Sequence, residues 1–415
     1  MTVRRSALAL TALTALTAAS AAFAPAAVAE DSPAPSPSVK LPSGLYGDSD
    51  PTYDGVYRQS LALLAQSTAG VEPSAKAVDW LTGQQCADGS FAPFRAEPSA
   101  DCDAKTPVDT NQTATAVQAL AALGGHDEAV GKAVDWLKSA QNDDGGWGYL
   151  PGGATDTNST SLVIGALAAT GTKADAVTSK KDKTPEDALL GLSLKCADGG
   201  AFAFQPEKNG DLTANEDATA AGVLGGLGSS LVVTKGDSAA QTACEKPSDA
   251  RAAAANGAAH LADVLKKDGH LTSAMPGAED QPDTGNTADA VTALYAAGLT
   301  DAAKKPLAWL EKNGPAWAKQ SGPSAWAQLV LTAHATGTDP RAFGGTDLVA
   351  GLNATGPAPK SAENTPSAED SAKQAEDAAD ADGSQISVWW IVGVGVLVGA
   401  GIGLMISLRN KSGRK

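Results

Sequence analysis

The chain has 415 residues, of which 47 are acidic and 31 are basic, and its formal net charge is −16. This charge, with no basic patch outside the two ends, argues against nucleic acid as a partner. Aromatic residues make up only 5% of the chain, and there are 44 glycines. Such a composition favours closely packed helices.

The N-terminus has the pattern of an export signal. Arg4 and Arg5 precede an apolar run that ends near residue 24, and Ala27-Val28-Ala29 forms a small-x-small cleavage site. We therefore expect residues 1–29 to be a cleaved signal peptide. Residues 30–49, rich in proline and serine, are expected to form a flexible leader.

Two segments repeat one pattern, Lys76–Phe91 (KAVDWLTGQQCADGSF) and Lys132–Trp147 (KAVDWLKSAQNDDGGW). Each predicts an amphipathic helix that ends in a glycine turn, followed by an aromatic residue that folds back onto the helix. A structural role is expected for the residues that keep their spacing, which are Trp80, Gln85, Phe91, Trp136, Gln141 and Trp147.

A second kind of segment follows each copy of the first. It begins with Asp-Thr or a related pair and continues into an alanine-rich helix, as in Asp109–Leu123, Asp156–Ala169 and Asp283–Ala297. The first residue is suited to cap the helix. These helices are apolar almost all round, which is typical of helices buried on both sides.

The two kinds alternate along residues 50–353 and predict an all-α fold. Inner helices are expected near 57–69, 109–123, 157–170, 215–228, 284–297 and 324–336. Outer helices are expected near 73–85, 128–141, 185–196, 249–267, 301–312 and 339–352. Because the last outer helix can pair with the first inner one, we predict a closed (α/α)6 toroid. The long loops that precede inner helices are expected at 86–108, 142–155, 196–214, 268–282 and 313–323.

Four cysteines lie in the part expected to be exported. An even number in an oxidising compartment favours two disulfides. Cys86 and Cys102 lie in one inter-helix segment and would close one loop. Cys196 with Cys244 then follows only by elimination. The alternative of a metal site is weaker, because the sequence has no CxxC motif.

The C-terminal part predicts a membrane anchor. Residues 354–385 are acidic and rich in proline, alanine and serine, and predict a disordered stalk. Residues 386–408 include the uncharged run Val388–Leu408, which is long enough to span a bilayer. The basic residues within 409–415 predict a cytoplasmic tail, so the N-terminal domain would be extracellular on a single-pass plasma-membrane protein.

The repeated segments resemble the Gln-Trp repeats of the terpene cyclase and protein prenyltransferase toroid superfamily, which includes the prenyltransferase/squalene oxidase repeat proteins. The resemblance covers roughly residues 50–353. It implies that Gln85 with Phe91, and Gln141 with Trp147, brace the helix ends.

The enzymes of this superfamily imply sites that the sequence lacks. Class II cyclases begin an inner helix with Asp-x-Asp-Asp-Thr-Ala, but this chain has Asp109-Thr110-Asn111-Gln112-Thr113-Ala114, and Asn111 is no strong acid. The zinc ligands of prenyltransferases are not found either. We therefore favour a protein that is not an enzyme, with no cofactor and no metal. The alternative is a toroid enzyme that resembles a terpenoid cyclase or a polysaccharide lyase.

The cobalamin carriers of the intrinsic factor and transcobalamin type form another branch. Their Val-Asp-Thr-x-x-Met-Ala phrase resembles Val108–Ala114 here, with Thr113 in place of methionine. The resemblance implies capture of a corrinoid, although the lid domain of those carriers is missing from this sequence.

A ligand site is expected where the inner helices begin, because the long loops meet there. The partner would be a corrinoid or another polar small molecule, or a membrane transporter or surface protein. For each aspartate, the alternative is a role as a helix cap alone. The candidate ligand-binding residues are Asp109, Asn111, Trp147, Tyr149, Asp156, Asn158, Phe204, Asp217, Asp283 and Asn286.

Overall fold

The structure, a computed structural model, describes residues 41–360 except 235, 237–242 and 275–279. Within these residues it contains twelve α-helices, two short 3-10 helices and one pair of two-residue strands. The all-α prediction is therefore confirmed. The expected signal peptide, most of the stalk and the expected anchor at 386–408 lie outside the described residues. None of the described helices has the length and apolar character needed to cross a membrane.

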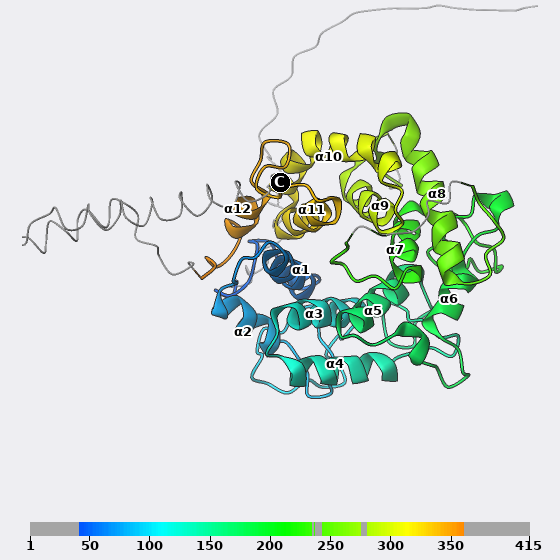
Figure 1. The fold of residues 1–415 in the computed structure, drawn as a ribbon. Helices are drawn as coiled ribbons and strands as arrows, with labels where there is room; N and C mark the ends of the chain where they lie inside the picture. Colours follow the sequence, from blue (N-terminus) through cyan, green and yellow to red (C-terminus); the bar gives the residue numbers. More distant parts are fainter. Residues whose placement is uncertain (1–40, 235, 237–242, 275–279, 361–415) are drawn as a thin grey trace, which may run out of the picture. The chain divides into compact units, whose positions relative to one another are not determined.

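Six helices of the described part form an inner ring (Figure 1). Each packs against the next one, and the last packs against the first, so the ring is closed. Small residues let the helices approach closely: Gly225 of one helix leaves room for Ser161 of its neighbour. The inner helices are α1 (Gly55–Thr68), α3 (Thr110–Leu123), α5 (Thr157–Ala169), α7 (Glu216–Gly226), α9 (Thr284–Ala296) and α11 (Pro323–Thr336).

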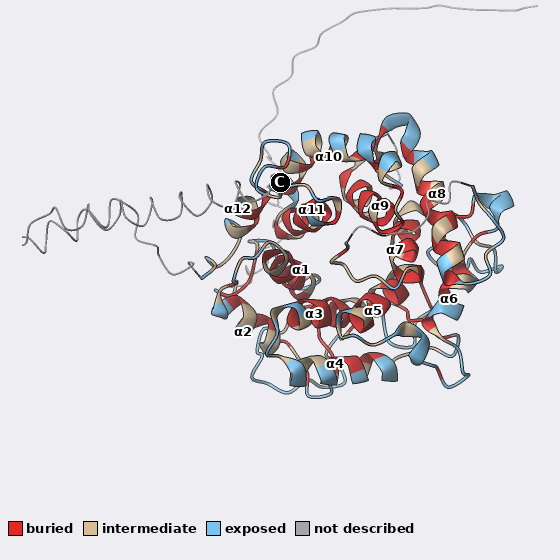
Figure 2. Cartoon of the chain, viewed as in Figure 1, coloured by how far each residue is buried: buried red, intermediate tan, exposed pale blue. Residues whose placement is uncertain are grey.

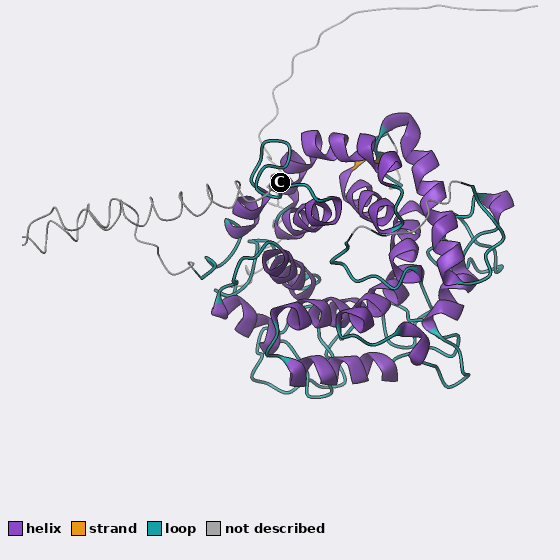
Figure 3. Cartoon of the chain, in the orientation of Figure 1, coloured by secondary structure: helices purple, strands orange, loops and turns teal. Residues whose placement is uncertain are grey.

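The other six helices lie outside the inner ring, each against the inner helix that adjoins it in sequence. Their outward sides are largely exposed, whereas the inner helices are buried along most of their length (Figure 2). The loops that join the two rings account for most of the non-helical chain (Figure 3). The outer helices are α2 (Ala75–Gly83), α4 (Asp127–Ser139), α6 (Pro185–Leu192), α8 (Ala250–Asp268), α10 (Thr300–Ser321) and α12 (Leu348–Asn353).

The ring is fastened where the two ends of the described chain meet. The buried Tyr46 donates its hydroxyl to Gln66 of α1, 2.9 Å away, and the Gln66 amide donates to Asn353 of α12 at 2.6 Å. The amide of Gly47 donates to the carbonyl of Thr355 at 2.7 Å. The last two contacts join residues from the two ends of the described chain, and they hold α1 beside α12.

One hydrogen bond recurs in four repeats and gives a structural role to the threonine that lies four positions after each helix cap. The threonine four positions after the helix cap accepts, at 3.0 Å in each case, the backbone N–H of the buried residue in the preceding loop. The loop residues are Phe91, Trp147, Phe202 and Leu271, and their threonines are Thr113, Thr160, Thr219 and Thr287. Thr113 thus stands where the cobalamin-carrier phrase has methionine, and here it joins a loop to a helix.

The predicted glutamine and aromatic braces occupy structural positions. Gln85 donates to the carbonyls of Gly89 and Ala129, at 3.1 and 2.8 Å, and Gln141 donates to that of Gly145 at 2.8 Å. Phe91 is fully buried below the first turn of this kind. Trp80 is also buried, whereas Trp136 is only partly buried against the core.

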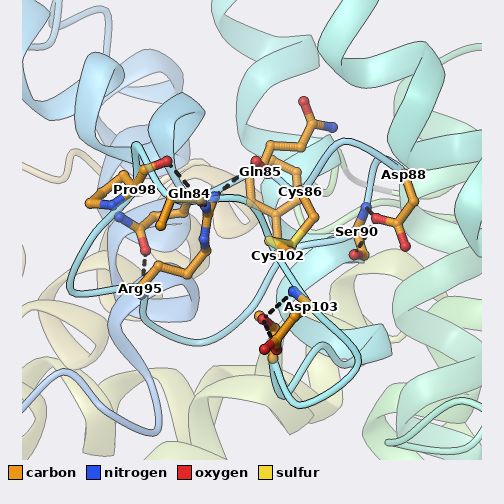
Figure 4. Close-up of a disulfide and its surroundings, with 12 residues drawn as sticks. Gln84, Gln85, Cys86, Asp88, Ser90, Arg95, Pro98, Cys102 and Asp103 are labelled. Carbon is orange, nitrogen blue, oxygen red and sulfur yellow. Dashed lines mark hydrogen bonds between the residues drawn. A yellow bond between two sulfur atoms is a disulfide. The ribbon is translucent and has the colours of Figure 1, made fainter.

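Both disulfides expected from the sequence are present, Cys86–Cys102 and Cys196–Cys244. The first closes the loop after α2 (Figure 4). Arg95 fixes the same loop: its amide donates to the Gln84 side chain at 2.6 Å, and its guanidinium donates to the Gln85 carbonyl at 3.1 Å. The second disulfide ties the loop before α7 to the segment before α8.

Three expected boundaries are wrong. The outer helix expected near 185–196 ends at Leu192. Outer helix 301–312 and loop 313–323 are one continuous helix, α10, that extends to Ser321. Gly314 lies inside it because the missing side chain leaves room for Leu329 of α11. The last expected outer helix, 339–352, is helical only from Leu348 onwards. The turn before it brings Gly344 against the Glu311 carbonyl in a left-handed conformation that favours glycine.

The segment after α7 lies at the end of the ring where the inner helices finish, near Ala122 of α3 and Ala169 of α5. The amide of Leu231 donates to the buried Gln118 side chain of α3 at 2.8 Å, and Val233 packs against Ala296 of α9 and Ala335 of α11. The amide of Gly236 donates to the carbonyl of Tyr295 at 3.1 Å. Residues 229–234 therefore cover this end of the ring, and we call them the plug segment.

Candidate ligand-binding site at the mouth of the ring

The face on which the inner helices begin is called the mouth here. It carries four of the five exposed large hydrophobic side chains of the described residues, namely Tyr53, Tyr149, Leu150 and Phe204; Tyr53 is 81% exposed. Backbone bonds place them: the carbonyls of Tyr149 and Phe204 accept the first amides of α3 and α5, both at 2.9 Å. The mouth thus has an apolar rim next to helix N-termini.

The predicted aspartates at the helix starts all act as caps. Asp109 accepts from the Gln112 amide at 2.8 Å, Asp156 from the Ser159 amide at 2.7 Å, and Asp283 from the Asn286 amide at 3.1 Å. Burial raises the pKa of Asp156. Asn286 is occupied as well, because its side-chain amide donates to Asp283 at 2.8 Å. The capping function accounts for these four residues without a ligand.

The second residue of α5 faces the neighbouring inner helix α7. Asn158 of α5 donates its side-chain amide to Asp217 of α7 at 2.9 Å. The pKa of Asp217 is raised by burial and by the charges of Asp283 and Asp156. Asn111 holds the corresponding place on α3, directly after the first helical residue. The structure therefore brings Asn158 and Asp217 together, as the predicted site requires.

Three residues that the sequence prediction missed complete this part of the mouth. Asp289 of α9 accepts from Gln328 of α11 at 2.7 Å. Burial and the charge of Asp217 raise the pKa of Asp289 to about 7, and burial and the charge of Asp289 raise that of Tyr57 on α1. The sequence signal that could have identified Asp289 and Gln328 is a polar residue about one turn into an otherwise apolar helix. All six inner helices contribute when Asn111 is included.

A separate group lies nearer the rim. Burial raises the pKa of Asp109 to about 6, and the nearby Tyr149 hydroxyl lowers it in part without the geometry of a regular hydrogen bond. The same hydroxyl lies near Gln112, whose side-chain amide donates to the carbonyl of Tyr53 at 3.2 Å. Tyr149 thus covers the first turn of α3, with its ring partly in solvent.

A small cavity lies deeper in the ring. It measures about 50 Å³, and its lining includes Asn158 and Ser161 of α5, Gln118 of α3, Ala221 of α7 and Leu231 of the plug segment. Ser161 is only 6% exposed, and its hydroxyl has no hydrogen-bond partner among the described residues. The space is larger than one water molecule requires.

Several acceptor oxygens at the mouth are buried without a regular hydrogen bond. Four buried oxygens there have no hydrogen bond of regular geometry among the described residues: Asp109 Oδ2, Asn111 Oδ1, Gln112 Oε1 and Asn158 Oδ1. The Tyr149 hydroxyl lies near two of these side chains, Asp109 and Gln112. Buried acceptors without donors are costly and rare, so the oxygens of Asn111 and Asn158 are the candidates for a donor supplied from outside. The arrangement suits a ligand rich in N–H or O–H groups.

Trp147 does not belong to this site, although the sequence predicted both a ligand-binding and a structural role for it. It is 1% exposed, and its indole nitrogen donates to the Leu137 carbonyl at 2.7 Å. Because Trp147 is buried, only the structural role predicted for it agrees with the structure. Tyr149 and Phe204, two positions after the buried Trp147 and Phe202, are the aromatic residues of the rim.

Metal binding has no cluster of suitable groups in the described part of the chain. No set of three or more histidine, cysteine, aspartate or glutamate side chains there lies close enough to hold an ion. His260 is paired loosely with Glu216, 3.9 Å away, and His270 lies against the Trp309 ring.

Comparisons with known proteins add little. No protein-family model matches the chain, and no curated protein is similar to it. A solved structure described as the crystal structure of a protein from Actinoplanes is similar over 66% of this chain and 77% of that chain, at 17% identity and with a TM-score of 0.40. A likeness of this degree assigns neither a family nor a function.

Proposed function

We propose that this protein is a non-catalytic (α/α)6 toroid of the terpene cyclase and protein prenyltransferase superfamily that captures a small molecule at its mouth. The observation that carries the proposal is the group of unpartnered buried oxygens on α3 and α5 beneath an exposed aromatic rim. A pocket with an apolar wall and a few converging polar groups is the usual form of a small-molecule site.

The exit of the chain supports a location at the cell surface. The last described residue, Lys360, donates its amide to the carbonyl of Glu72 at 3.0 Å, and Glu72 follows the C-terminal end of α1. The chain therefore leaves the ring on the face opposite the mouth. A stalk and a membrane anchor downstream, as the sequence at 386–408 predicts, would leave the mouth open to the exterior. The disulfides fit an exported domain.

Corrinoids are the first ligand class to test. The amide groups on the periphery of a corrinoid supply N–H donors, and its flat ring suits an aromatic rim. The Asp-Thr phrase itself is no support, because Asp109 and Thr113 serve the fold. The support comes from the acceptors at Asn111, Gln112 and Asn158, which those structural bonds leave free.

Isothermal titration of the full chain in detergent with hydroxocobalamin and with cobinamide tests the proposal. One-site binding, weakened by Asn111→Ala and by Tyr149→Ala, is the expected result. Asp211→Asn, an exposed change in the loop before α7, serves as the matched control. Binding that neither mouth variant weakens would place the corrinoid elsewhere, and no heat with either compound would remove corrinoids as the ligand.

A further inference from the structure

We propose that Asn209 is a site of spontaneous chemical modification, at which the folded chain converts this asparagine into aspartate and isoaspartate through a cyclic imide. The inference is independent of the proposed capture function. It rests on the contrast between one exposed Asn-Gly pair and two protected pairs, and on the contacts of Asp211 with the side chain of Asn209.

The sequence contains three Asn-Gly pairs, Asn209-Gly210, Asn256-Gly257 and Asn313-Gly314. Glycine has no Cβ, so its backbone nitrogen can approach the carboxamide carbon of the preceding asparagine closely. Bond formation between these two atoms closes a five-membered imide ring. An intramolecular attack of this kind has the advantage of a high effective concentration.

Two of the three pairs are held inside helices. Asn256 of α8 is 1% exposed, and its side chain accepts from the Glu245 amide at 3.0 Å and donates to the Glu245 carbonyl at 2.6 Å. Asn313 of α10 donates to the Trp309 carbonyl at 2.8 Å. Within a helix the next amide donates to the carbonyl four positions back, so ring closure at either asparagine requires the helix to open.

Asn209 lies instead at the tip of an exposed turn in the loop before α7. All of residues 207–211 are exposed, and the Glu207 amide closes the turn by donating to the Asp211 carbonyl at 2.9 Å. The Gly210 amide, which must lose its proton in the reaction, donates to the Glu207 carbonyl at 2.8 Å. At a loop tip this bond can open locally while the domain stays folded.

Asp211 contacts both ends of the carboxamide that reacts. Its backbone N–H donates to Asn209 Oδ1 at 3.0 Å, and its carboxylate accepts from Asn209 Nδ2 at 2.8 Å. The first contact places a donor at the oxygen on which negative charge develops during the attack. The second places a proton-carrying group beside the nitrogen that leaves. The turn therefore holds the carboxamide with assistance at both of its polar atoms.

The reaction needs only water as a co-reactant. The Gly210 nitrogen loses its proton and bonds to Asn209 Cγ, the bond from Cγ to Nδ2 breaks, and Nδ2 leaves with that proton as ammonia. Water then opens the imide at either carbonyl, which gives aspartate or isoaspartate at position 209. The turn, which already carries Glu207 and Asp211, thus gains one negative charge at the edge of a surface cavity of about 550 Å³.

The test is incubation of the full chain in detergent at neutral pH, with and without urea, followed by peptide mapping by mass spectrometry. In the folded protein we expect conversion at Asn209 to be at least about 100 times faster than at Asn256 or Asn313, because the other two sites require a helix to open. Isoaspartate should be among the products at position 209, since it arises from the imide and not from direct hydrolysis. In urea the rates at the three sites should become similar.

Two variants separate the contributions, and thermal melting shows whether each is folded. Asn209→Gln prevents closure of a five-membered ring, so conversion at this position should stop, while the other two sites still react in urea. Asp211→Asn should slow conversion of Asn209 in the folded protein and leave its rate in urea unchanged.

Three results would overturn the inference: equal rates at the three sites in the folded protein, no conversion of Asn209 in the folded protein when it occurs in urea, or aspartate without isoaspartate at position 209. An unaltered rate in folded Asp211→Asn would overturn the assistance by Asp211.

Discussion

The early and late repeats of the ring differ in how the chain passes from an outer helix to the next inner helix. After α4 the chain leaves the outer helix at a glycine turn, buries Trp147 and then enters α5. After α8 it does the same with Leu271 in place of an aromatic residue. After α10 there is no such loop, because that helix continues to Ser321 and α11 follows directly.

The difference shows which part of the repeat the fold requires. The threonine that accepts the loop amide is the same residue type for Trp147 and for Leu271, although the buried side chains differ greatly in size. Where α10 extends, Trp317 from the outer helix lies near Gly285 at the start of α9. In the four repeats that have this loop, the hydrogen bond is thus the constant element, and the buried side chain adapts to the space.

The largest expected effect comes from the aromatic brace of the early repeats. Trp147→Ala should lower the free energy of unfolding by about 3–5 kcal/mol, because it removes a large buried side chain and the hydrogen bond from its indole to the Leu137 carbonyl. Trp136→Ala, in the same repeat but only partly buried, is the control and should cost clearly less. Urea unfolding measures both, and equal losses would contradict the assignment of Trp147 as the brace.

The next largest effect is expected from removal of a disulfide. Replacement of both Cys196 and Cys244 by serine is expected to cost about 3–4 kcal/mol, and that of Cys86 and Cys102 slightly less, because the first pair closes the longer loop, 48 residues against 16. Denaturant unfolding of the two double variants gives the comparison. If the shorter loop proves the more costly to open, native contacts of Arg95 rather than loop length dominate there.

The hydrogen bond between the loop amide and the threonine should contribute equally to stability in the early and the late repeats. Thr160→Val and Thr287→Val each leave a buried backbone N–H without its acceptor, so we expect each to cost about 1–3 kcal/mol. Thr336→Val is a suitable control, since that hydroxyl bonds only within its own segment of the chain. A large cost at Thr160 and none at Thr287 would show that the late repeats do not depend on this bond.

The sequence predicted much of the fold and little of the site. Helix order, caps and the early braces follow from local patterns in residues such as Asp109, Gln141 and Trp147. The continuity of α10 does not, because Asn313-Gly314 is a turn signal that contact with Leu329 overrides. Asp289 and Gln328 were missed because their importance comes from neighbours on other helices. The burial of Trp147 removed it from the mouth, a distinction that spacing alone cannot make.

The smallest expected effect is a pH dependence of stability that arises at the mouth. Burial and the charges of Asp217 and Asp283 raise the folded-state pKa of Asp289 from 3.8 to about 7, so between these values the folded protein binds more protons than the unfolded chain. The contribution of Asp289 to stability is therefore greatest at low pH and declines as the pH rises through this window. Asp109, with a pKa raised to about 6, acts in the same direction.

Asp289→Asn isolates this contribution, because the amide oxygen of asparagine can still accept from Gln328. Between about pH 5 and about pH 7.5 the melting temperature of the unaltered protein should fall by roughly 2–4 °C relative to that of the variant. Asp211→Asn, with its exposed carboxyl, should follow the unaltered protein. Parallel curves for the unaltered protein and Asp289→Asn would mean that Asp289 does not titrate in this range, and would place the acidity of the mouth at Asp217 instead.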